Sequence, residues 1–441
     1  MDYGKCWRNN AGDGLFSNPQ NWSDNTLPAS GEDVTVIATS ETLITSASDM
    51  TVGTVSVPFG VARFGGSGVI TVGGVDVSFG ASLATGGALR FSSLAIPSGA
   101  VVEITGVEGL ADAGITGAGT LVINPGAGNT LTMTKNNTGF TGLAVIKSGT
   151  VKFGDRWCFG RRPAKIRVKG GATLDENDMG DDAYDGEKNI VTLEEGATVT
   201  TSGGTRTRNG VLTTLTLEGD ATVDASGGWV ALGQDWNWDY SHINLAAHTL
   251  MVTGNKKFYI MGCIIAGTGM IDVSNGVTVA CSHRYYHDAT TTCADGTIRI
   301  REGATWCLEN YTGHLTHLSV KNLILDDAVT RDVNTYTLTV TDSISGSGTT
   351  QMLTMKPGAV FKPSGTGYLT ITDSLSGVLK IDLSKPGLKN ASKIPLVKVP
   401  SALASSVSFD NLPKSHELRI DEVDGTVEYW LKHTGFAIIM R

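Results

Sequence analysis

The sequence lacks several features that would place it in a common structural class. Only 17% of its 441 residues are charged. Coiled coils and long helical bundles are much richer in Ala, Leu, Glu and Lys than this sequence is. No run approaches the ~18 apolar residues that a transmembrane helix needs. The net charge is −9 and there is no basic run, which argues against nucleic acid or an anionic membrane as partner. We expect a soluble protein that is not built from long helices.

Proline is also scarce, at 12 residues, whereas glycine is abundant at 56. Apolar residues make up 40% of the chain and are spread throughout it, which argues against disorder. No window of 11 or more residues shows a convincing helical period. Short runs such as TLVINP, TLTMTK and TLTVTD alternate with period two and carry β-branched residues, which indicates strands.

The six cysteines do not form a recognisable metal motif. They are Cys6, Cys158, Cys263, Cys281, Cys293 and Cys307, with no CxxC and no Cys/His spacing expected of zinc. Cys281 and Cys293 bracket a polar loop. Their spacing is compatible with a disulfide in an oxidising compartment, and it is equally compatible with two ordinary buried thiols.

A glycine-led phrase recurs along the chain, as in GATLDE from Gly171, GATVTT from Gly196, GVTVAC from Gly276 and GATWCL from Gly303. We take the following positions as equivalent: Val61, Ala81, Ala100, Ala127, Thr150, Ala172, Ala197, Ala221, Ala247, Val277, Ala304, Ala328 and Ala359. The spacing of roughly 25 residues is typical of a solenoid. A coil of this length, divided by glycine turns into short strands, suits a parallel β-helix, because coils stack at about 4.8 Å.

The predicted fold is therefore all-β: a parallel β-helix of about 13 coils of roughly 25 residues, closed by a cap at each end. Residues 1–35 break the repeat and form the expected N-terminal cap. Residues 36–376 form the β-helix, with loop insertions at about 154–317. Residues 377–441 form the expected C-terminal β cap, with strands around LKIDL, KIPLVKV, ELRID and VEYWL. Caps are needed because the ends of such a stack expose unpaired strand edges.

Residues 115–154 read ITGAGTLVINPGAGNTLTMTKNNTGFTGLAVIKSGTVKFG. This segment resembles the autotransporter-associated β-strand repeat, with its Gly-x-Gly-Thr-Leu, Gly-x-Gly-x-x-Leu-x-Leu, Asn-Thr-aromatic-x-Gly and Gly-Thr-Leu elements. Phe140 stands in place of the family's aromatic residue, shifted by one. The resemblance implies a right-handed parallel β-helix located outside a bacterial cell or on its surface. It does not imply one activity, because such proteins include adhesins and enzymes.

Long polar segments interrupt the repeat. In the alignment they occupy the same position in successive coils, so we expect them to leave the solenoid along one edge. They are residues 154–163, 175–189, 202–210, 226–242, 281–296 and 307–317. Loops that leave a rigid scaffold from one edge are a common place for function. We expect this loop edge to bind a polysaccharide or other glycan, with aromatic rings covering the sugar ring and arginine recognising its anionic groups. The predicted ligand-binding residues are Trp157, Arg161, Arg206, Trp236, Trp238, Tyr240, Tyr285, Tyr286, His287 and Tyr311. The opposing interpretation is that these aromatic rings fold back onto the coils.

Catalysis is an alternative use of the same edge. A glycoside hydrolase needs two carboxyl groups about 5 Å apart for retention or 6.5–9.5 Å for inversion, and stacked coils offer both spacings. The candidate carboxylates are Asp235, Asp239, Asp288 and Glu309, and a lyase would instead use His283, Arg284 or His287 as its base. A structural spacer or assembly protein is the second alternative.

No cofactor is expected, although the acidic run 175–189 suggests Ca²⁺ as one possibility through Asp178, Asp181 and Asp185. This run does not follow the EF-hand pattern, because its fifth position is Met179. A solvated acidic loop is the competing interpretation.

Overall fold

The computed structural model describes residues 3–38, 41–86, 88–107, 110, 112–160, 163–177, 189–202, 210–212, 214–233, 241–260, 262–283, 289–310, 316–326, 329–332, 336–363, 365, 367–384 and 393–434. Strands account for 56% of the residues and helix for 3%, and the parallel sheets stack as a right-handed β-solenoid of about 12 turns. The prediction of a parallel β-helix is confirmed. The chain divides into two compact units, Met1–Gly203 and Gly204–Arg441, which are described in turn.

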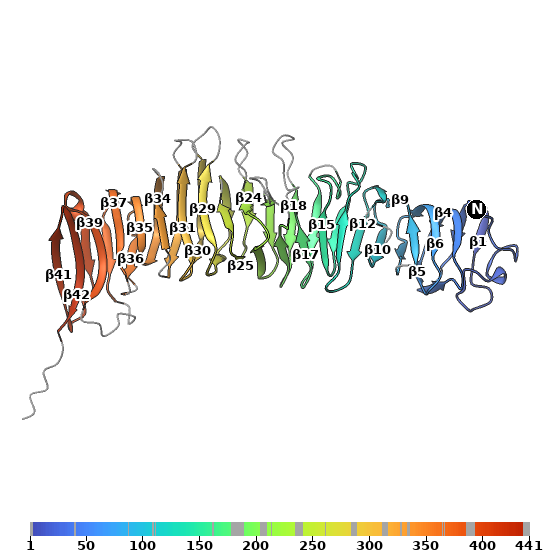
Figure 1. Ribbon diagram of the computed structural model, residues 1–441, viewed down its shortest axis with the longest axis horizontal. Helices are drawn as coiled ribbons and strands as arrows, with labels where there is room; N and C mark the ends of the chain where they lie inside the picture. The colour runs from blue at the N-terminus through green and yellow to red at the C-terminus, as the bar shows by residue number, and fades with distance from the viewer. Residues whose placement is uncertain are drawn as a thin grey trace, which may run out of the picture. The chain divides into compact units, whose positions relative to one another are not determined.

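Unit 1 contains three runs of parallel strands. The first run is β1 (Lys5–Trp7), β2 (Val34–Val36), β4 (Met50–Val57), β6 (Ile70–Val77), β8 (Leu89–Phe91), β9 (Ser93–Ala95) and β11 (Gly114–Thr116). The second is β3 (Thr42–Thr45), β5 (Val61–Gly65), β7 (Ser82–Ala84), β10 (Val101–Thr105), β12 (Thr120–Asn124), β14 (Leu143–Ile146), β16 (Lys165–Val168) and β18 (Ile190–Leu193). The third is β13 (Thr130–Met133), β15 (Thr150–Phe153), β17 (Thr173–Asp175) and β19 (Thr198–Thr200). Figure 1 shows these strands side by side in successive coils.

The core of unit 1 consists of columns of apolar side chains that stack from coil to coil. In the second run, Ile123, Ile146, Val168 and Leu193 are paired in register and all are fully buried. Side chains alternate between the two faces of a strand, so the residues between them point outward. Full burial of each such side chain contributes roughly 1.5–3 kcal/mol relative to exposure. This column explains why the repeat places β-branched and aliphatic residues at every second position.

The register corrects several of the positions that the repeat alignment treats as equivalent. Ala127 was aligned with Thr150, but the residue that pairs with Thr150 is Thr130. Val61 pairs with Ser82 rather than with Ala81, and Thr150 pairs with Thr173 rather than with Ala172. These last two were each aligned one residue away from the true partner. A one-residue slip moves a side chain to the opposite face. Val61 is accordingly 36% exposed, whereas Ala81 is buried.

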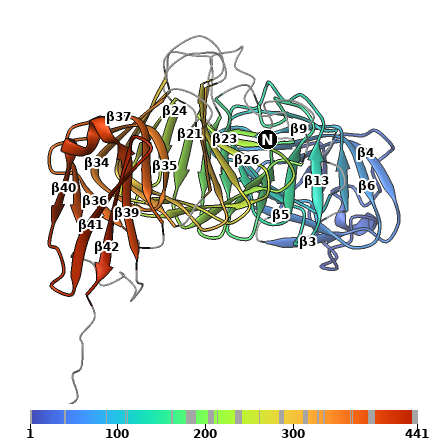
Figure 2. The same ribbon diagram turned by 60° about the vertical axis from the view of Figure 1, so that its left-hand side comes forward.

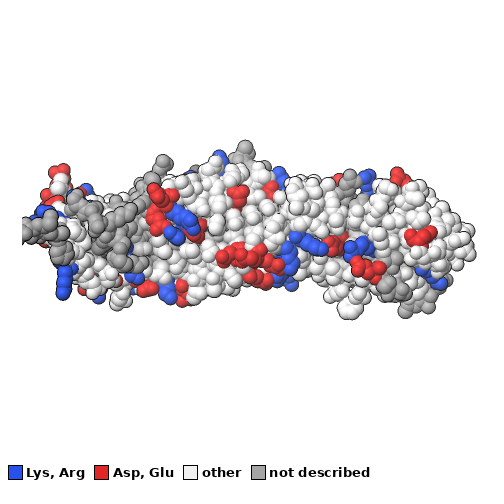
Figure 3. Space-filling model, turned by 90° about the horizontal axis from the view of Figure 1, so that it is seen from below, with Lys and Arg blue, Asp and Glu red and all other residues white. Residues whose placement is uncertain are grey.

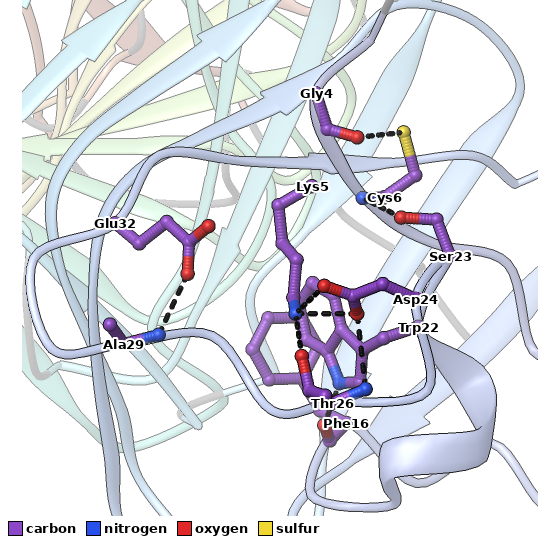
Figure 4. A network of polar contacts seen from close by, with 10 residues as sticks. All are labelled: Gly4, Lys5, Cys6, Phe16, Trp22, Ser23, Asp24, Thr26, Ala29 and Glu32. Carbon is purple, nitrogen blue, oxygen red and sulfur yellow. Dashed lines mark hydrogen bonds and ion pairs between the residues drawn. The ribbon is translucent and has the colours of Figure 1, made fainter.

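The N-terminal end of unit 1 is closed by an aromatic cluster around a short 3₁₀ helix, η1 (Pro19–Asn21). Trp7, Phe16 and Trp22 are fully buried, and the Phe16 and Trp22 rings meet edge to face at 4.7 Å. The indole N–H of Trp22 donates to the Phe16 carbonyl at 2.8 Å. Lys5 extends across this cluster to Asp24 and Thr26 (Figure 4). The expected N-terminal cap therefore has its own core and also contributes β1 to the first run of strands.

Unit 2 again contains three runs of strands. The first is β21 (Thr214–Leu217), β24 (Ser241–Asn244) and β27 (Cys263–Ala266), and the second is β22 (Ala221–Ala225), β25 (Thr249–Gly254) and β28 (Met270–Val273). Both runs join the long strands β30 (Ala289–Ile300), β32 (Thr316–Leu325) and β34 (Tyr336–Gly346). The third run is a separate sheet of β20 (Gly210–Leu212), β23 (Val230–Leu232), β26 (Lys257–Ile260), β29 (Thr278–His283), β31 (Thr305–Asn310) and β33 (Val329–Asp332), called the loop sheet below.

The repeated phrase does not mark one face throughout unit 2. Ala221 begins β22 in the second run, whereas Val277 and Ala304 directly precede β29 and β31 of the loop sheet. The assumption that the phrase always marks the same point of a coil is therefore wrong within this unit. A glycine turn followed by a small buried residue suits any corner of the coil, because the small side chain fits the tight inner bend.

The C-terminal part of unit 2 continues the parallel pairing beyond residue 376. It comprises β35 (Gly348–Met355), β36 (Val360–Pro363), β37 (Leu369–Ser376), β38 (Leu379–Asp382), β39 (Ile394–Pro400), η3 (Ser401–Ser406), β40 (Val407–Asp410), β41 (His416–Val423) and β42 (Thr426–His433). β38 and β39 still pair in parallel with β36 and β37, and β40 pairs in parallel with β38. Only the final hairpin is antiparallel: β42 pairs with β39, and β41 pairs with β42 (Figure 2).

Among the cysteines whose side chains the structure describes, Cys6, Cys158, Cys263 and Cys293 are free thiols, and all are buried. Cys293 therefore does not form the disulfide with Cys281 that their spacing permits. Its side chain faces the interior of the coil, in register with Ile265 on β27. The interpretation as an ordinary buried residue is the correct one for Cys293.

Candidate functional site

The polar segments of unit 1 leave from neighbouring strands. Residues 154–163 follow β15, residues 176–189 follow β17, and residues 201–203, the last of this unit, follow β19. These three strands pair in register, with Val151 beside Leu174 and Leu174 beside Val199. The segments of this unit therefore begin at the same edge of one sheet.

The polar segments of unit 2 begin along one edge of the loop sheet. Residues 234–240, 284–288 and 311–315 follow β23, β29 and β31. Leu232 is paired with Ile260 of β26, Ile260 with Cys281 of β29, and Cys281 with Leu308 of β31, so the strands end close together. β26 is followed by only two residues before β27 begins at Cys263. The starts after β23 and β29 are thus two strand spacings, about 10 Å, apart.

Most of the predicted site residues lie outside the described residues. Among the predicted ligand-binding residues these are Arg161, Arg206, Trp236, Trp238, Tyr240, Tyr285, Tyr286, His287 and Tyr311. The same holds for the candidate catalytic residues Asp235, Asp239, Arg284 and Asp288, and for the candidate metal ligands Asp178, Asp181 and Asp185. For His283 and Glu309 the structure describes the backbone alone: His283 pairs with Asn310, and Glu309 pairs with Ser282.

Trp157 is the one predicted ligand-binding residue whose side chain is described. It is half-buried at the start of the segment after β15, and its backbone N–H donates to the Asp155 carboxylate at 2.8 Å. The guanidinium carbon of Arg156 lies 4.2 Å from the centroid of its ring. This cation–π stack covers one face of the indole. Trp157 therefore fits the interpretation in which an aromatic ring of the loop edge packs within the protein.

Asp175, at the start of the acidic run, has a structural role. Its side chain is buried, and its carboxylate accepts hydrogen bonds from the backbone N–H groups of Asn177 and Ser202 at 2.9 and 2.8 Å. The Ser202 hydroxyl donates to the same carboxylate. These bonds tie the segment after β17 to the segment after β19. Within the described part of the chain, no group of three or more His, Cys, Asp or Glu side chains is arranged to hold a metal ion.

A compact aromatic and cationic cluster lies at the first strands of the loop sheet. The rings of Trp229 and Tyr259 are 5.5 Å apart between centroids and inclined at 56°. The Lys257 ammonium lies 5.6 Å from the Trp229 centroid and 5.8 Å from the Tyr259 centroid. All three side chains are partly exposed. We call Trp229, Lys257 and Tyr259 the aromatic platform.

The strand pattern of β26 explains why the platform faces outward. Phe258 and Ile260 are fully buried, so Lys257 and Tyr259 project from the opposite face. Tyr259 is paired with Ala231 on one side and Ala280 on the other. Both neighbours are small and buried, so the tyrosine ring extends further from the sheet than the side chains on either side of it. Trp229 lies one residue before the pair Val230–Phe258, which brings it beside Lys257.

Sequence reasoning missed Lys257 and Tyr259 as site residues, because it searched the long segments between strands. The run KFYI nevertheless carries the signal, since a cation and an aromatic residue alternate with two apolar residues. In a β-solenoid that alternation predicts outward-facing Lys257 and Tyr259. Their contact with Trp229 depends on the register between coils, which the alignment did not establish.

Several charged side chains elsewhere on the described surface tie one coil to another. Lys147 bonds Glu103 at 2.8 Å, Lys169 bonds Glu194 at 2.6 Å, and Arg301 bonds the buried Asp272 at 2.6 Å. Figure 3 shows acidic and basic side chains next to each other in small clusters on the face in view. The two charges of each pair neutralise each other locally.

No protein-family model, curated protein or solved structure matches this chain. In the part of the chain that the structure covers, no helix has the length and apolar character needed to span a membrane. The platform and the shared edge of the loop sheet are thus the features on which a function can be argued.

Proposed function

We propose that this protein is a glycan-binding module that holds a polysaccharide on the outer face of the loop sheet in unit 2. The observation that carries the proposal is the aromatic platform, in which two partly exposed rings and an ammonium group share one surface. Adhesion to a glycan-bearing surface is the role that such a module would serve.

The chemistry of the platform suits a sugar ring. The apolar C–H face of a pyranose covers an aromatic ring, and the inclined rings of Trp229 and Tyr259 offer two such surfaces on adjacent coils. Lys257 supplies a cation beside both rings, which favours a carboxylate or sulfate substituent on the sugar. The ligand class that we infer is therefore an acidic polysaccharide.

The scaffold supports binding to a polymer rather than to a single sugar. Strands of the loop sheet repeat at about 4.8 Å, so positions on its outer face form rows along the sheet. The strands β23, β29 and β31 end along one edge of that face, and an extended chain would lie beside their ends. The place outside a bacterial cell that the repeat resemblance implies is part of the same proposal.

The test is direct binding of the full chain to an array of neutral, uronate-containing and sulfated glycans, followed by calorimetry on the ligands that bind. Trp229→Ala and Tyr259→Ala should each weaken binding about tenfold or more. Lys257→Met should weaken binding of anionic glycans only and reduce its salt dependence. Phe79→Ala is the matched control, because Phe79 is an aromatic residue of unit 1 that is 79% exposed. Binding unchanged by all three platform variants would contradict the proposal.

A polysaccharide-degrading enzyme is the alternative that the sequence analysis leaves open. Glu309 pairs with Ser282 and His283 pairs with Asn310, so Glu309 and His283 occupy successive positions of the ladder, which alternate between the two faces of the sheet, and the register does not bring them together. A reducing-end assay and ultraviolet detection of unsaturated products distinguish the two functions. Turnover that Glu309→Gln or His283→Ala abolishes would establish catalysis, whereas binding without products supports the glycan-binding module.

A further inference from the structure

The last strand of unit 2 has an edge that no other described strand covers. β41 pairs along its whole length with β42, from His416 beside His433 to Val423 beside Thr426. β42 in turn pairs with β39 on its other side. Among the described residues β41 has no second strand partner, and it forms the outer strand of this sheet in Figure 1. No other described strand therefore pairs with its second row of backbone N–H and C=O groups, which is the row that an added strand would use.

The side chains of β41 are exposed on both faces of the strand. Ile420 is 60% exposed and Val423 is 52% exposed. Between and around them are Glu417, Arg419, Asp421 and Glu422, so half of the eight residues are charged. An edge with this mixture resists indiscriminate pairing, because most registers bring like charges together. The charges also identify which register is compatible with pairing.

A symmetric pair of β41 strands is restricted to a few registers. A two-fold axis that relates two neighbouring antiparallel strands must stand perpendicular to the sheet, so it keeps each face of the strand on the same side. Directly opposite residues in an antiparallel pair also share a face. Both conditions hold only if some residue lies directly opposite its own copy, with the axis standing between the two. An axis midway between two successive residues would set positions from different faces opposite each other. For an overlap of seven residues, that residue is Arg419 or Ile420.

The two registers differ sharply in their charge pairs. Centring on Arg419 places the two arginines opposite each other and sets Glu417 of each copy against Asp421 of the other. Centring on Ile420 places Arg419 of each copy opposite Asp421 of the other, so two opposite-charge pairs form. The exposed Ile420 side chains then face each other on the opposite side of the sheet. Only the second register is self-complementary.

The two charged side chains are available on the same face of the strand. The Arg419 guanidinium bonds the Glu417 carboxylate at 2.7 Å. The Asp421 carboxylate accepts the Trp430 indole N–H at 2.8 Å and lies 4.0 Å from the Lys393 ammonium. Both remain almost half-exposed, at 44% for Arg419 and 47% for Asp421. A guanidinium has five donors and a carboxylate about four acceptor positions, so each can add one more partner.

We propose that β41 is a self-association edge through which two copies of this chain pair antiparallel about Ile420. Each Arg419 bonds Asp421 of the second copy, and the two hairpins join into one continuous sheet. A pairing of this limited length makes a reversible dimer that forms at high concentration. This inference is independent of the proposed glycan binding, since it concerns a different surface of unit 2.

Sedimentation velocity of the full chain over a range of concentrations tests the proposal. Wild-type protein should show a concentration-dependent dimer. Arg419→Asp and Asp421→Arg each replace two attractive pairs with two repulsive ones, so either variant should raise the dimer Kd at least tenfold. An equimolar mixture of the two single variants should form a heterodimer, because both pairs are then again of opposite charge. The double variant R419D/D421R should recover the homodimer for the same reason.

Two further variants make the result decisive. Ile420→Lys changes an exposed side chain and should abolish the dimer without altering the melting temperature. Phe79→Ala, which alters an exposed aromatic residue of unit 1, should leave the dimer unchanged. The proposal is overturned if wild-type protein stays monomeric at every concentration, if Ile420→Lys still dimerises, or if the mixed single variants fail to associate.

Discussion

Lys5 and Asp24 form an ion pair in which only the cation is buried. The Lys5 side chain is 6% exposed and that of Asp24 is 54% exposed. The ammonium lies 2.6 and 2.8 Å from the two carboxylate oxygens, and it also donates to the Thr26 hydroxyl at 2.6 Å (Figure 4). The pair fixes the segment after η1 over the aromatic cluster at the N-terminal end of unit 1.

This asymmetry predicts an order of stabilities for two substitutions. Asp24→Asn leaves a buried ammonium without its counter-charge, which is the costly way to break such a pair. Lys5→Met replaces the ammonium with an apolar side chain of similar length above Trp22 and leaves Asp24 to the solvent. Thermal unfolding should therefore show a larger loss of stability for Asp24→Asn than for Lys5→Met. The reverse order would mean that Asp24 does not offset the cost of burying the Lys5 ammonium.

The same pair predicts a dependence of stability on acid. The hydrogen bond from Lys5, followed by that from the Thr26 N–H, lowers the pKa of Asp24 from 3.8 to about 2. Because the folded pKa lies below the unfolded one, this contribution is present above about pH 4 and is lost as the pH falls toward 2. Urea unfolding of wild type and Asp24→Asn should show a stability difference that shrinks between about pH 5 and pH 2. A difference that stays constant over that range would contradict the assignment.

Two glycines at the same turn of consecutive coils predict different tolerances to a side chain. Gly60 and Gly80 both have positive φ, at 79° and 75°, so alanine is strained at either position. A Cβ at Gly60 would collide with the Ala38 carbonyl of the preceding coil, whereas a Cβ at Gly80 meets nothing within 4 Å. Gly80→Ala should cost about 1–2 kcal/mol from backbone strain alone. Gly60→Ala should cost roughly 3 kcal/mol or more, measured by chemical denaturation. Equal losses of stability would indicate that the backbone around Ala38 shifts at little cost to make room for the Cβ.

Three buried thiols are expected to resist alkylation in the folded protein. Burial raises the pKa of Cys293 to about 11 and that of Cys263 to about 12, and it also raises the pKa of Cys158. The reactive thiolate is therefore scarce, in addition to being inaccessible. Iodoacetamide at pH 8 should leave the peptides that contain these residues unmodified in the folded protein and modify them in denaturant. Fast modification without denaturant would show that the coils open locally.

The regular part of the fold could be predicted from sequence because each coil repeats the same local requirements. The phrase around Ala172 and the phrase around Ala197 are aligned correctly, since Thr173 pairs with Thr198. Val61 and Thr150 were aligned one residue away because their turns differ in composition from the strict copies. Composition specifies that a glycine corner is present, but the hydrogen-bonded ladder decides which residue follows it into the core.

The candidate site was harder to predict because it depends on contacts between coils. Trp229 and Tyr259 are 30 positions apart in sequence and meet only through the register of β23 and β26. The shared edge for the polar segments of unit 2 agrees with the structure, although the repeated phrase used to predict it falls on two sheets. Trp157 could not be assigned from sequence, because its cover by Arg156 depends on side-chain placement.

The collision of a Gly60 side chain with the Ala38 carbonyl has a wider consequence for how this protein can change through mutation. Whether a residue is replaceable is decided by the layer beneath it, about one repeat earlier in the chain, and not by its immediate neighbours. A comprehensive mutational scan of unit 1 should consequently show intolerance that recurs at the repeat length. New surface chemistry would then arise most readily at corners where the underlying layer leaves space, as it does at Gly80.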